Sequence, residues 1–206
     1  MRDTKAFPIV ISGPSGVGKT TLVDAILDSV SMLKRSVSVT TRRPRAGEIE
    51  GDSYFFVSEE DFEALKETEL IEWATVHKAS YGTPRGFVEK NLEKGLDVVL
   101  NIDVQGGRDV KKCFPEALTV FILPPSFEVL EQRIRERATD PAEDIQTRLE
   151  NAREEIRALP HYEYVVINDK LDQAVATLRA IILSERCRRT RCPDDLVEKF
   201  GGGAAE

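Results

Sequence analysis

Short, nearly continuous apolar runs recur along the chain and predict buried strands. The runs are residues 7–11, 98–102, 118–123 and 164–168. Because they are too apolar for a sheet with one face in water, both faces of the sheet should be covered. Apolar residues at helical spacing alternate with these runs, in three stripes: Leu22, Val23, Ile26, Leu27 and Val30; Ile145, Leu149, Ala152, Ile156 and Leu159; and Leu171, Ala174, Val175, Leu178, Ile181 and Ile182. This alternation predicts an α/β fold, a parallel-sheet core flanked by helices.

Residues 36–88 interrupt this alternation. Strand patterns at residues 36–39, 54–57 and 70–76 predict a small sheet-rich insertion.

The same region carries signals for helix ends. Ser58 followed by Asp61 is a capping-box pattern, and Thr83 before Pro84 predicts a second helix start. Gly95 suits the end of that second helix, because glycine readily adopts the left-handed conformation that often follows a helix.

A second irregular segment, residues 126–148, predicts a helical lid in which two helices flank the polar link ATDPAED. The tail from Arg188 has no periodicity, so we expect it to be frayed. Its arginines, with Arg186, are interpreted as a solvated helix end, with support of subunit contacts as the alternative. The chain thus divides, as one domain of 206 residues, into core segments 5–35, 89–125 and 149–187, insertion 36–88, lid 126–148 and tail 188–206.

Composition is typical of a cytoplasmic globular protein. The chain is 41% hydrophobic and 32% charged, and no run approaches the ~18 apolar residues of a membrane span. Its first residues lack the pattern of a secretory signal, so a cytoplasmic location is expected. Cys113, Cys187 and Cys192 match neither a zinc site nor a redox pair and are interpreted as reduced thiols.

The formal net charge of −7 argues against a non-specific nucleic-acid binder, which needs a positive surface. Arginines nevertheless cluster within residues 42–45 and 133–137. Such local clusters suit small anions.

Residues 13–20, GPSGVGKT, match the phosphate-binding pattern GxxxxGK[ST] at every fixed position. The pattern follows an apolar strand and opens an amphipathic helix, which is the context that its chemistry requires. Backbone N–H groups and Lys19 would bind nucleotide phosphates, and the Thr20 hydroxyl would bind Mg²⁺. The alternative is a glycine-rich turn with an exposed lysine. The predicted nucleotide-binding residues of this segment are Gly13, Ser15, Gly16, Gly18, Lys19, Thr20 and Thr21.

The insertion indicates what accepts the phosphoryl group. Arg42, Arg45, Tyr54 and Tyr81 suit a phosphate monoester, although an exposed basic loop with core aromatics is the alternative. A phosphate acceptor would repel the triphosphate by about 4 kcal/mol per charge pair at ~4 Å and an effective dielectric constant of about 20. Such a site needs positively charged side chains around both phosphate groups to offset this repulsion.

The predicted lid offers further cations. Arg133 and Arg137 are four residues apart and share a helix face, and Arg148 follows on the next helix. They would cover the transferring group, whereas a solvated charged helix is the alternative. Near pH 7 a phosphate monoester is mostly dianionic, so no catalytic base is required. His77 and His161 are accordingly interpreted as structural.

With these segments in place, the chain resembles the bacterial guanylate kinases. The matching stretches are ISGPSGVGKTTL, SVSVTTRRPRAGEIEGDSYFF, IEWATVHKASYGT, IDVQG, FILPPS, the RIRER and TRL parts of the lid, and VIND, between residues 7 and 186. The resemblance implies a P-loop NTPase-type core, a GMP-binding insertion and a lid. It also implies Mg²⁺-dependent transfer of the γ-phosphoryl group of ATP directly to GMP, with dGMP as an expected further acceptor.

The resemblance assigns residues by their positions. Arg42, Arg45, Tyr54 and Tyr81 would bind the GMP phosphate; Ser38, Glu72, Thr83 and Asp103 would surround guanine; Arg133, Arg137 and Arg148 would contact ATP phosphates; and Asn168 would lie near adenine. The expected catalytic residues are Lys19, Arg42, Arg133, Arg137 and Arg148.

The assignment of the base also makes chemical sense. Guanine presents N1–H and an amino group as donors, which suit the Glu72 carboxylate, and its O6 needs a donor such as the Thr83 hydroxyl. Adenine would oppose a lone pair to the carboxylate, a mismatch able to supply selectivity on the order of 10⁴. A surface acid before Trp73 is the alternative interpretation of Glu72.

Three positions depart from the family pattern. Asn101 stands where an acid is common, Ala138 where the lid often has glycine, and Lys170 where another acid is usual. The first puts a charged magnesium contact at that position in doubt, so Asp103 would have to contribute more, and the second would stiffen the lid.

Two other functions fit parts of this pattern. Guanylate-kinase-like domains of scaffolding proteins bind phosphorylated peptides without catalysis, but they typically have damaged phosphate loops. A kinase for another phosphorylated acceptor would keep the loop, whereas only a guanine-type edge needs both Glu72 and Thr83.

Overall fold

The computed structural model describes residues 4–76, 79–137 and 142–202. Its core is a five-stranded, all-parallel sheet in the order β2-β7-β1-β8-β9. The strands are β1 (Pro8–Ser12), β2 (Leu33–Arg35), β7 (Asp97–Asn101), β8 (Leu118–Leu123) and β9 (Tyr164–Ile167). The four strands expected from apolar runs are confirmed, and β2 joins them at an edge. In the described part of the chain, no helix combines the length and apolarity of a bilayer span.

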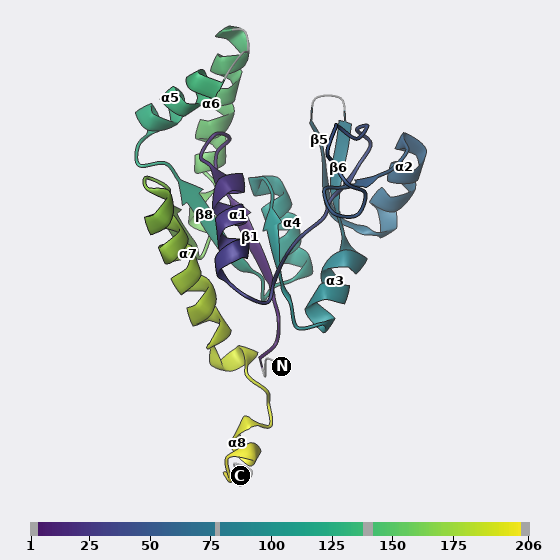
Figure 1. The fold of residues 1–206 in the computed structure, drawn as a ribbon, viewed down its shortest axis with the longest axis vertical. Helices are drawn as coiled ribbons and strands as arrows, with labels where there is room; N and C mark the ends of the chain where they lie inside the picture. The colour runs from purple at the N-terminus through teal and green to yellow at the C-terminus, as the bar shows by residue number, and fades with distance from the viewer. Residues whose placement is uncertain (1–3, 77–78, 138–141, 203–206) are drawn as a thin grey trace.

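Alternate residues of the central strands face two helical layers. Ile9 and Ile11 of β1 belong to a core cluster that includes residues of α1 (Lys19–Ser29) and α7 (Leu171–Arg186). Val10, between them, belongs to a second cluster with residues of α3 (Arg85–Glu93) and α4 (Val104–Cys113). Both faces of the sheet are therefore covered, as the apolar runs predict (Figure 1).

A second, four-stranded sheet forms the expected insertion. Its order is β4-β3-β6-β5, with β5 antiparallel to β6 and β3 antiparallel to β6. The elements are β3 (Val39–Thr40), β4 (Phe55–Phe56), α2 (Glu59–Thr68), β5 (Leu70–Val76) and β6 (Ala79–Pro84). The pattern at residues 70–76 predicts β5 correctly, whereas β6 has no pattern of its own.

Both predicted helices form, but only the first has its cap at the predicted residue; the second begins one residue later than predicted, with Pro84 and not Thr83 as its N-cap. Ser58 caps α2 by accepting a hydrogen bond from the Asp61 backbone N–H at 3.0 Å. Thr83 and Pro84 instead end β6, where Pro84 pairs with Leu70, and α3 begins one residue later. Strand pairing and a side-chain bond from Thr83 to Glu72 hold this segment extended.

The helix that follows ends near the predicted position. Lys94 is the last capping residue of α3, and Gly95 has a φ of 76°, in the left-handed region that glycine adopts without steric cost.

The expected lid consists of α5 (Phe127–Arg137) and α6 (Ala142–Ile156). Figure 1 shows these helices and the second sheet projecting from the same end of the core. The predicted boundary at residue 148 falls inside α6. The part of the helix after that boundary packs on the core, where Leu149 and Ala152 are buried. Ala138 lies outside the described residues.

The expectation of a frayed tail is wrong for its first residues. Arg191, in the short 3-10 helix η2 (Arg189–Arg191), is only 6% exposed. Its guanidinium donates to Glu185 at 2.6 Å and lies 3.7 Å from the centre of the Phe7 ring. Arg186 likewise bonds the buried Asp97 at 2.8 Å. These arginines anchor the end of α7 and are not a solvated helix end.

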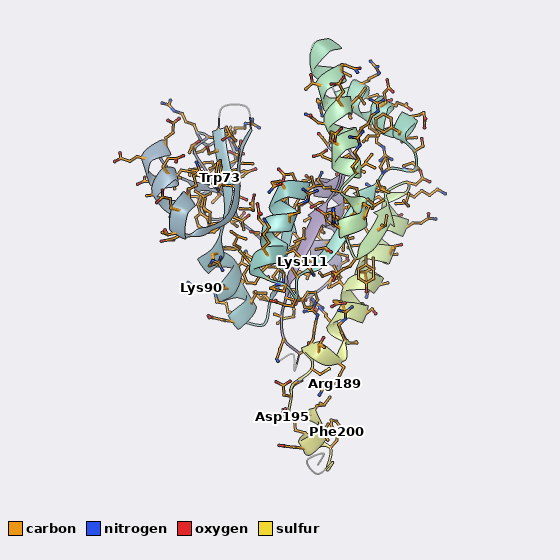
Figure 2. All side chains as sticks on the ribbon, turned by 180° about the vertical axis from the view of Figure 1, so that it is seen from behind. Trp73, Lys90, Lys111, Arg189, Asp195 and Phe200 are labelled. Atoms are coloured by element: carbon orange, nitrogen blue, oxygen red, sulfur yellow. The ribbon has the colours of Figure 1, made fainter. Side chains whose placement is uncertain are left out.

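The chain continues beyond this anchor. A second 3-10 helix, η1 (Leu159–His161), precedes β9, and the short α8 (Leu196–Lys199) follows η2. Phe200, just after α8, is 85% exposed and lies at the end of the molecule away from the lid (Figure 2).

Candidate active site

The phosphate-binding pattern forms a tight loop between β1 and α1. Gly13, Gly16 and Gly18 have φ values of 148°, 87° and 93°, in the left-handed region that favours glycine. A Cβ atom at Gly13 would lie 2.3 Å from the carbonyl oxygen of Ile122, and one at Gly18 would lie 2.7 Å from the Asn168 amide nitrogen. Backbone and neighbours therefore both require glycine here.

Lys19 folds back over this loop. Its ammonium donates to the carbonyl oxygens of Gly13 at 2.6 Å and Pro14 at 3.2 Å. Burial lowers the pKa of Lys19, and the nearby charges of Glu155 and Asp103 act against that shift. The exposed-lysine alternative is wrong, because this lysine is held within the loop by defined partners.

A cavity of about 310 Å³ adjoins the loop, and its walls include Gly16, Gly18, Thr21, Arg133 and Asn168. The Asn168 side chain donates to the Val17 carbonyl at 2.8 Å, and Arg133 donates to the Asn168 carbonyl at 3.1 Å. Residues from the loop, the lid and the end of β9 thus meet around one space. These contacts join the predicted adenine-side residue to the predicted lid cation.

Thr20, the second residue of α1, lies next to Asn101 at the end of β7. The Asn101 amide donates to the Thr20 hydroxyl at 3.3 Å. Among the described residues, no group of three or more His, Cys, Asp or Glu side chains is arranged to hold a metal ion. Mg²⁺ in nucleotide sites uses few protein ligands together with phosphate oxygens and water, so a single hydroxyl fits its chemistry.

Glu155 was not predicted, yet it contacts the loop. Its carboxylate accepts a hydrogen bond from the Ser15 backbone N–H at 3.1 Å. Burial raises the pKa of Glu155, and the Ser15 bond and the Lys19 charge act against that shift. Because 140 positions separate the two residues, no local pattern signals their contact.

Three predicted phosphate ligands lie together at the second sheet: Tyr81 of β6, and Arg42 and Tyr54 from the segment between β3 and β4. The Arg42 guanidinium is 5.3 Å from the centre of the Tyr54 ring, whose centre is 5.9 Å from that of Tyr81. Glu48, which the sequence interpretation missed, accepts two bonds from Arg42 at 2.7 and 3.0 Å. This paired hydrogen bond raises the pKa of Arg42, which keeps the guanidinium charged.

Arg45 is placed differently from Arg42. Its side chain is exposed, and its backbone N–H donates to Glu48 at 2.7 Å. Glu48 therefore holds the backbone between the two predicted phosphate ligands in a turn. One carboxylate fixes both the Arg42 side chain and the Arg45 main chain.

Glu72 and Thr83, predicted to recognise the base, are bonded to each other. The Thr83 hydroxyl donates to Glu72 at 2.5 Å, and the carboxylate also lies close to Gly106 of α4. Burial raises the pKa of Glu72 to about 7; the Thr83 bond lowers it, and the charges of Asp103 and Asp109 add to the increase. The surface-acid alternative is wrong. The predicted bond from Thr83 to guanine O6 requires its proton to turn from Glu72 to the base.

Asp103 and Ser38, the other two residues predicted to surround guanine, make different hydrogen bonds. Asp103 caps α4 by accepting from the Gly106 N–H at 2.8 Å, and its charge acts on both Lys19 and Glu72. Its carbonyl accepts from the Ser12 hydroxyl at 3.2 Å, just before the phosphate loop, and Gly106 lies against Glu72, so Asp103 lies between the loop and the predicted guanine site. The Ser38 carbonyl accepts from the Phe55 N–H at 2.9 Å, which joins β3 to β4.

Two predicted lid cations remain. Arg148 is half-buried on α6. Arg137 ends α5, and its side chain lies outside the described residues.

Comparison with known proteins connects this geometry to a family. A family model described as guanylate kinase matches residues 5–185. The chain belongs to the guanylate kinase family. The guanylate kinase of Caldanaerobacter subterraneus subsp. tengcongensis is 52% identical over 187 residues, which cover 90% of this chain and 91% of that protein. The guanylate kinase of Rickettsia prowazekii is 44% identical over 185 residues, which cover 89% and 94%.

A solved structure in the family agrees with the fold. The crystal structure of guanylate kinase from Anaplasma phagocytophilum matches with a TM-score of 0.78 and 32% sequence identity, covering 100% of both chains. The resemblance noted from the motifs and the expected P-loop NTPase-type fold are both confirmed.

Proposed function

We propose that this protein transfers the γ-phosphoryl group of ATP to GMP, giving ADP and GDP. The observation that carries the proposal is the place of Asp103, which contacts both sites. Its carbonyl accepts from the Ser12 hydroxyl at 3.2 Å, just before the phosphate loop, and its carboxylate accepts from the N–H of Gly106, which lies against Glu72. The triphosphate site and the buried carboxylate that suits guanine are therefore neighbours. Membership of the guanylate kinase family supports the same reaction.

Residues 36–88 form the GMP-binding part in this proposal, and residues 126–148 form the lid. Arg42, Arg45, Tyr54 and Tyr81 bind the GMP phosphate, whereas Ser38, Glu72, Thr83 and Asp103 surround guanine. On the ATP side, Lys19 with the loop N–H groups and Arg133, Arg137 and Arg148 bind phosphates, and Asn168 lies beside adenine. The two sets of cations offset the repulsion between two anionic substrates.

We further propose that Mg²⁺ accompanies ATP and that Thr20 supplies its protein hydroxyl. When bound, the ion neutralises charge on the β and γ phosphates. Thr20 is held next to Asn101, whose amide brings no charge to the ion. Phosphate oxygens and water therefore supply the rest of its coordination.

The acceptor oxygen needs no general base in this reaction. The second pKa of a phosphate monoester is about 6, so near pH 7 the phosphate of GMP is already the dianion whose oxygen attacks. The protein's residues position the two phosphates in line and exclude water.

The chain's three cysteines are free thiols, which suits the proposed cytoplasmic location.

Label transfer tests the reaction. ATP labelled in the γ-phosphate and incubated with GMP should give GDP labelled in its β-phosphate, with no label on denatured protein. Lys19→Ala should reduce the transfer rate roughly 10²- to 10³-fold, because it removes a preorganised cation from the transferring group. Calorimetric binding of GMP should remain unchanged in that variant.

Two outcomes would contradict the proposal. Label retained on the protein would indicate a covalent intermediate. Binding of ATP and GMP to the wild-type protein without transfer would favour a binding module of the scaffolding type.

A further inference from the structure

The side chain of Glu155 joins helix α6 to the phosphate loop. The Glu155 carboxylate accepts from the Ser15 N–H at 3.1 Å, and its charge acts on Lys19 of the same loop. Ser15 precedes Gly16, which has a φ of 87°. The contact therefore holds the loop immediately before one of its left-handed turns.

The same helix carries a predicted ATP ligand. Arg148 and Glu155 are seven residues apart within α6, so they share a helix face and lie about 10 Å apart along the axis. Leu149 and Ala152, between them, are buried in the core cluster. A rigid, anchored helix thus links the carboxylate at the loop to the arginine above it.

The backbone N–H groups of the phosphate loop differ in their hydrogen-bond partners. The Val17 N–H bonds the Pro14 carbonyl at 3.2 Å inside the loop. Within the part of the chain that the structure describes, no protein acceptor is recorded for the N–H groups of Gly16 and Gly18. These two donors remain available to phosphate oxygens, whereas the N–H of Ser15, a predicted nucleotide-binding residue, is bonded to Glu155 of α6 in this structure.

We propose that Glu155 is a positioning residue, which fastens the phosphate loop to α6 and thereby sets the distance from the loop to Arg148. This inference rests on the proposed function, because its consequence is the alignment of the transferring phosphate. Glu155 acts through the loop and the helix and does not touch the substrate.

The role of Glu155 lies in its acceptor oxygen. A negative charge beside a triphosphate site repels the substrate, so the charge itself opposes binding. A neutral glutamine has an equivalent acceptor oxygen and keeps the side-chain length. Glu155→Gln should therefore preserve the contact, and Glu155→Ala should remove it.

Hydrogen exchange of the Ser15 amide, measured by NMR on the ligand-free protein, tests the contact without reference to activity. The amide should be protected in the wild type and in Glu155→Gln and should exchange at least tenfold faster in Glu155→Ala. The matched control is Glu154→Ala, because Glu154 is 65% exposed and, within the described residues, forms an ion pair only with Arg157, three residues further along the chain. Equal Ser15 exchange in the wild type and Glu155→Ala would overturn the proposal.

Steady-state kinetics with ATP and GMP test the consequence. We expect kcat to fall roughly 10- to 100-fold in Glu155→Ala, because reacting groups misplaced by about 1 Å can cost a factor of that order. The KM for GMP should not change, and Glu155→Gln should restore kcat to within threefold of the wild type. Glu154→Ala should behave as the wild type, and thermal unfolding should show that every variant is folded.

The failures are distinguishable. A Glu155→Gln variant as slow as Glu155→Ala, or a Glu155→Ala variant as fast as the wild type, would overturn the positioning role. A wild-type protein that transfers no phosphate would overturn the proposed function and with it the catalytic consequence, while Ser15 exchange would still decide whether Glu155 holds the loop.

Discussion

Glu72 joins burial to recognition within one side chain. Burial raises its pKa to about 7, so near neutral pH the carboxyl group is divided between its two protonation states. Only the ionised form can accept from both guanine donors, N1–H and the amino group. Ionisation of Glu72 and binding of GMP are therefore expected to be linked.

This linkage predicts a pH dependence with a definite sign. Below about pH 7 the raised pKa keeps Glu72 protonated, so GMP should bind more tightly as the pH rises from 6 to 8, with a slope approaching tenfold per pH unit below the pKa. The GMP phosphate titrates near 6 in every variant, so Glu72→Gln serves to isolate the contribution of the carboxyl group.

Calorimetric Kd values for GMP and for an ATP analogue, measured at several pH values, check this expectation. Glu72→Gln should weaken GMP binding and flatten its pH profile while leaving the ATP analogue nearly unaffected. Parallel pH profiles for GMP in the two proteins, or equal losses for both nucleotides, would contradict the assignment of Glu72.

At the scale of elements, the apolar runs predicted four strands of the core, because a strand that is buried on both faces has a nearly continuous apolar sequence. Strand β2 has the sequence LKR and is only half-buried, so its sequence contains no apolar run. Strand β6 contains Gly82 and Pro84 and exists through its pairing with β5. The helix start predicted at Thr83 and Pro84 comes one residue too early, because both residues still belong to β6, where Pro84 pairs with Leu70.

The site was predictable to the extent that motifs are local. The phosphate loop was recognisable from eight consecutive residues, and clustered arginines and tyrosines suggested the other phosphate ligands, whereas the residues around guanine and adenine came from family resemblance. The contacts of Glu48 and Glu155 were not recognised, because a surface acid and an acid that orients a ligand look alike in sequence. Only the folded chain shows that Glu155 reaches Ser15.

The anchor of the tail gives a prediction about stability. Arg191→Ala would leave Glu185, 4% exposed, as a buried carboxylate without its closest cation, so we expect a loss of about 3–5 kcal/mol in the free energy of unfolding. Urea unfolding measures it, and exposed Arg189 is the matched control, because its change to Ala should alter stability by at most about 0.5 kcal/mol.

The position of this anchor keeps the test separate from catalysis. Arg189 lies toward the end of the molecule opposite the lid (Figure 2), so kcat per folded molecule should stay at the wild-type value in both variants. Equal unfolding free energies for Arg191→Ala and Arg189→Ala would show that the tail is not an anchor.

At the scale of the whole molecule, the lid helices and the second sheet project from one end of the core (Figure 1). Each carries cations assigned to a different substrate. Two anionic nucleotides must enter separately and then react away from water, so we expect both parts to close over them.

Small-angle X-ray scattering checks this expectation. A bisubstrate analogue that joins the two nucleotides should reduce the radius of gyration, whereas a single nucleotide should reduce it less. Superimposable scattering profiles with and without the analogue would count against closure.

The central claim is that the molecule selects guanine as the base of its phosphoryl acceptor. The most direct measurement is ADP release in a coupled assay, with GMP, AMP, UMP and dTMP compared at equal ATP. Recognition by Glu72 and Thr83 predicts a kcat/KM for GMP that exceeds each of the others by a factor on the order of 10⁴. Comparable values for GMP and any other monophosphate of the panel would contradict the account.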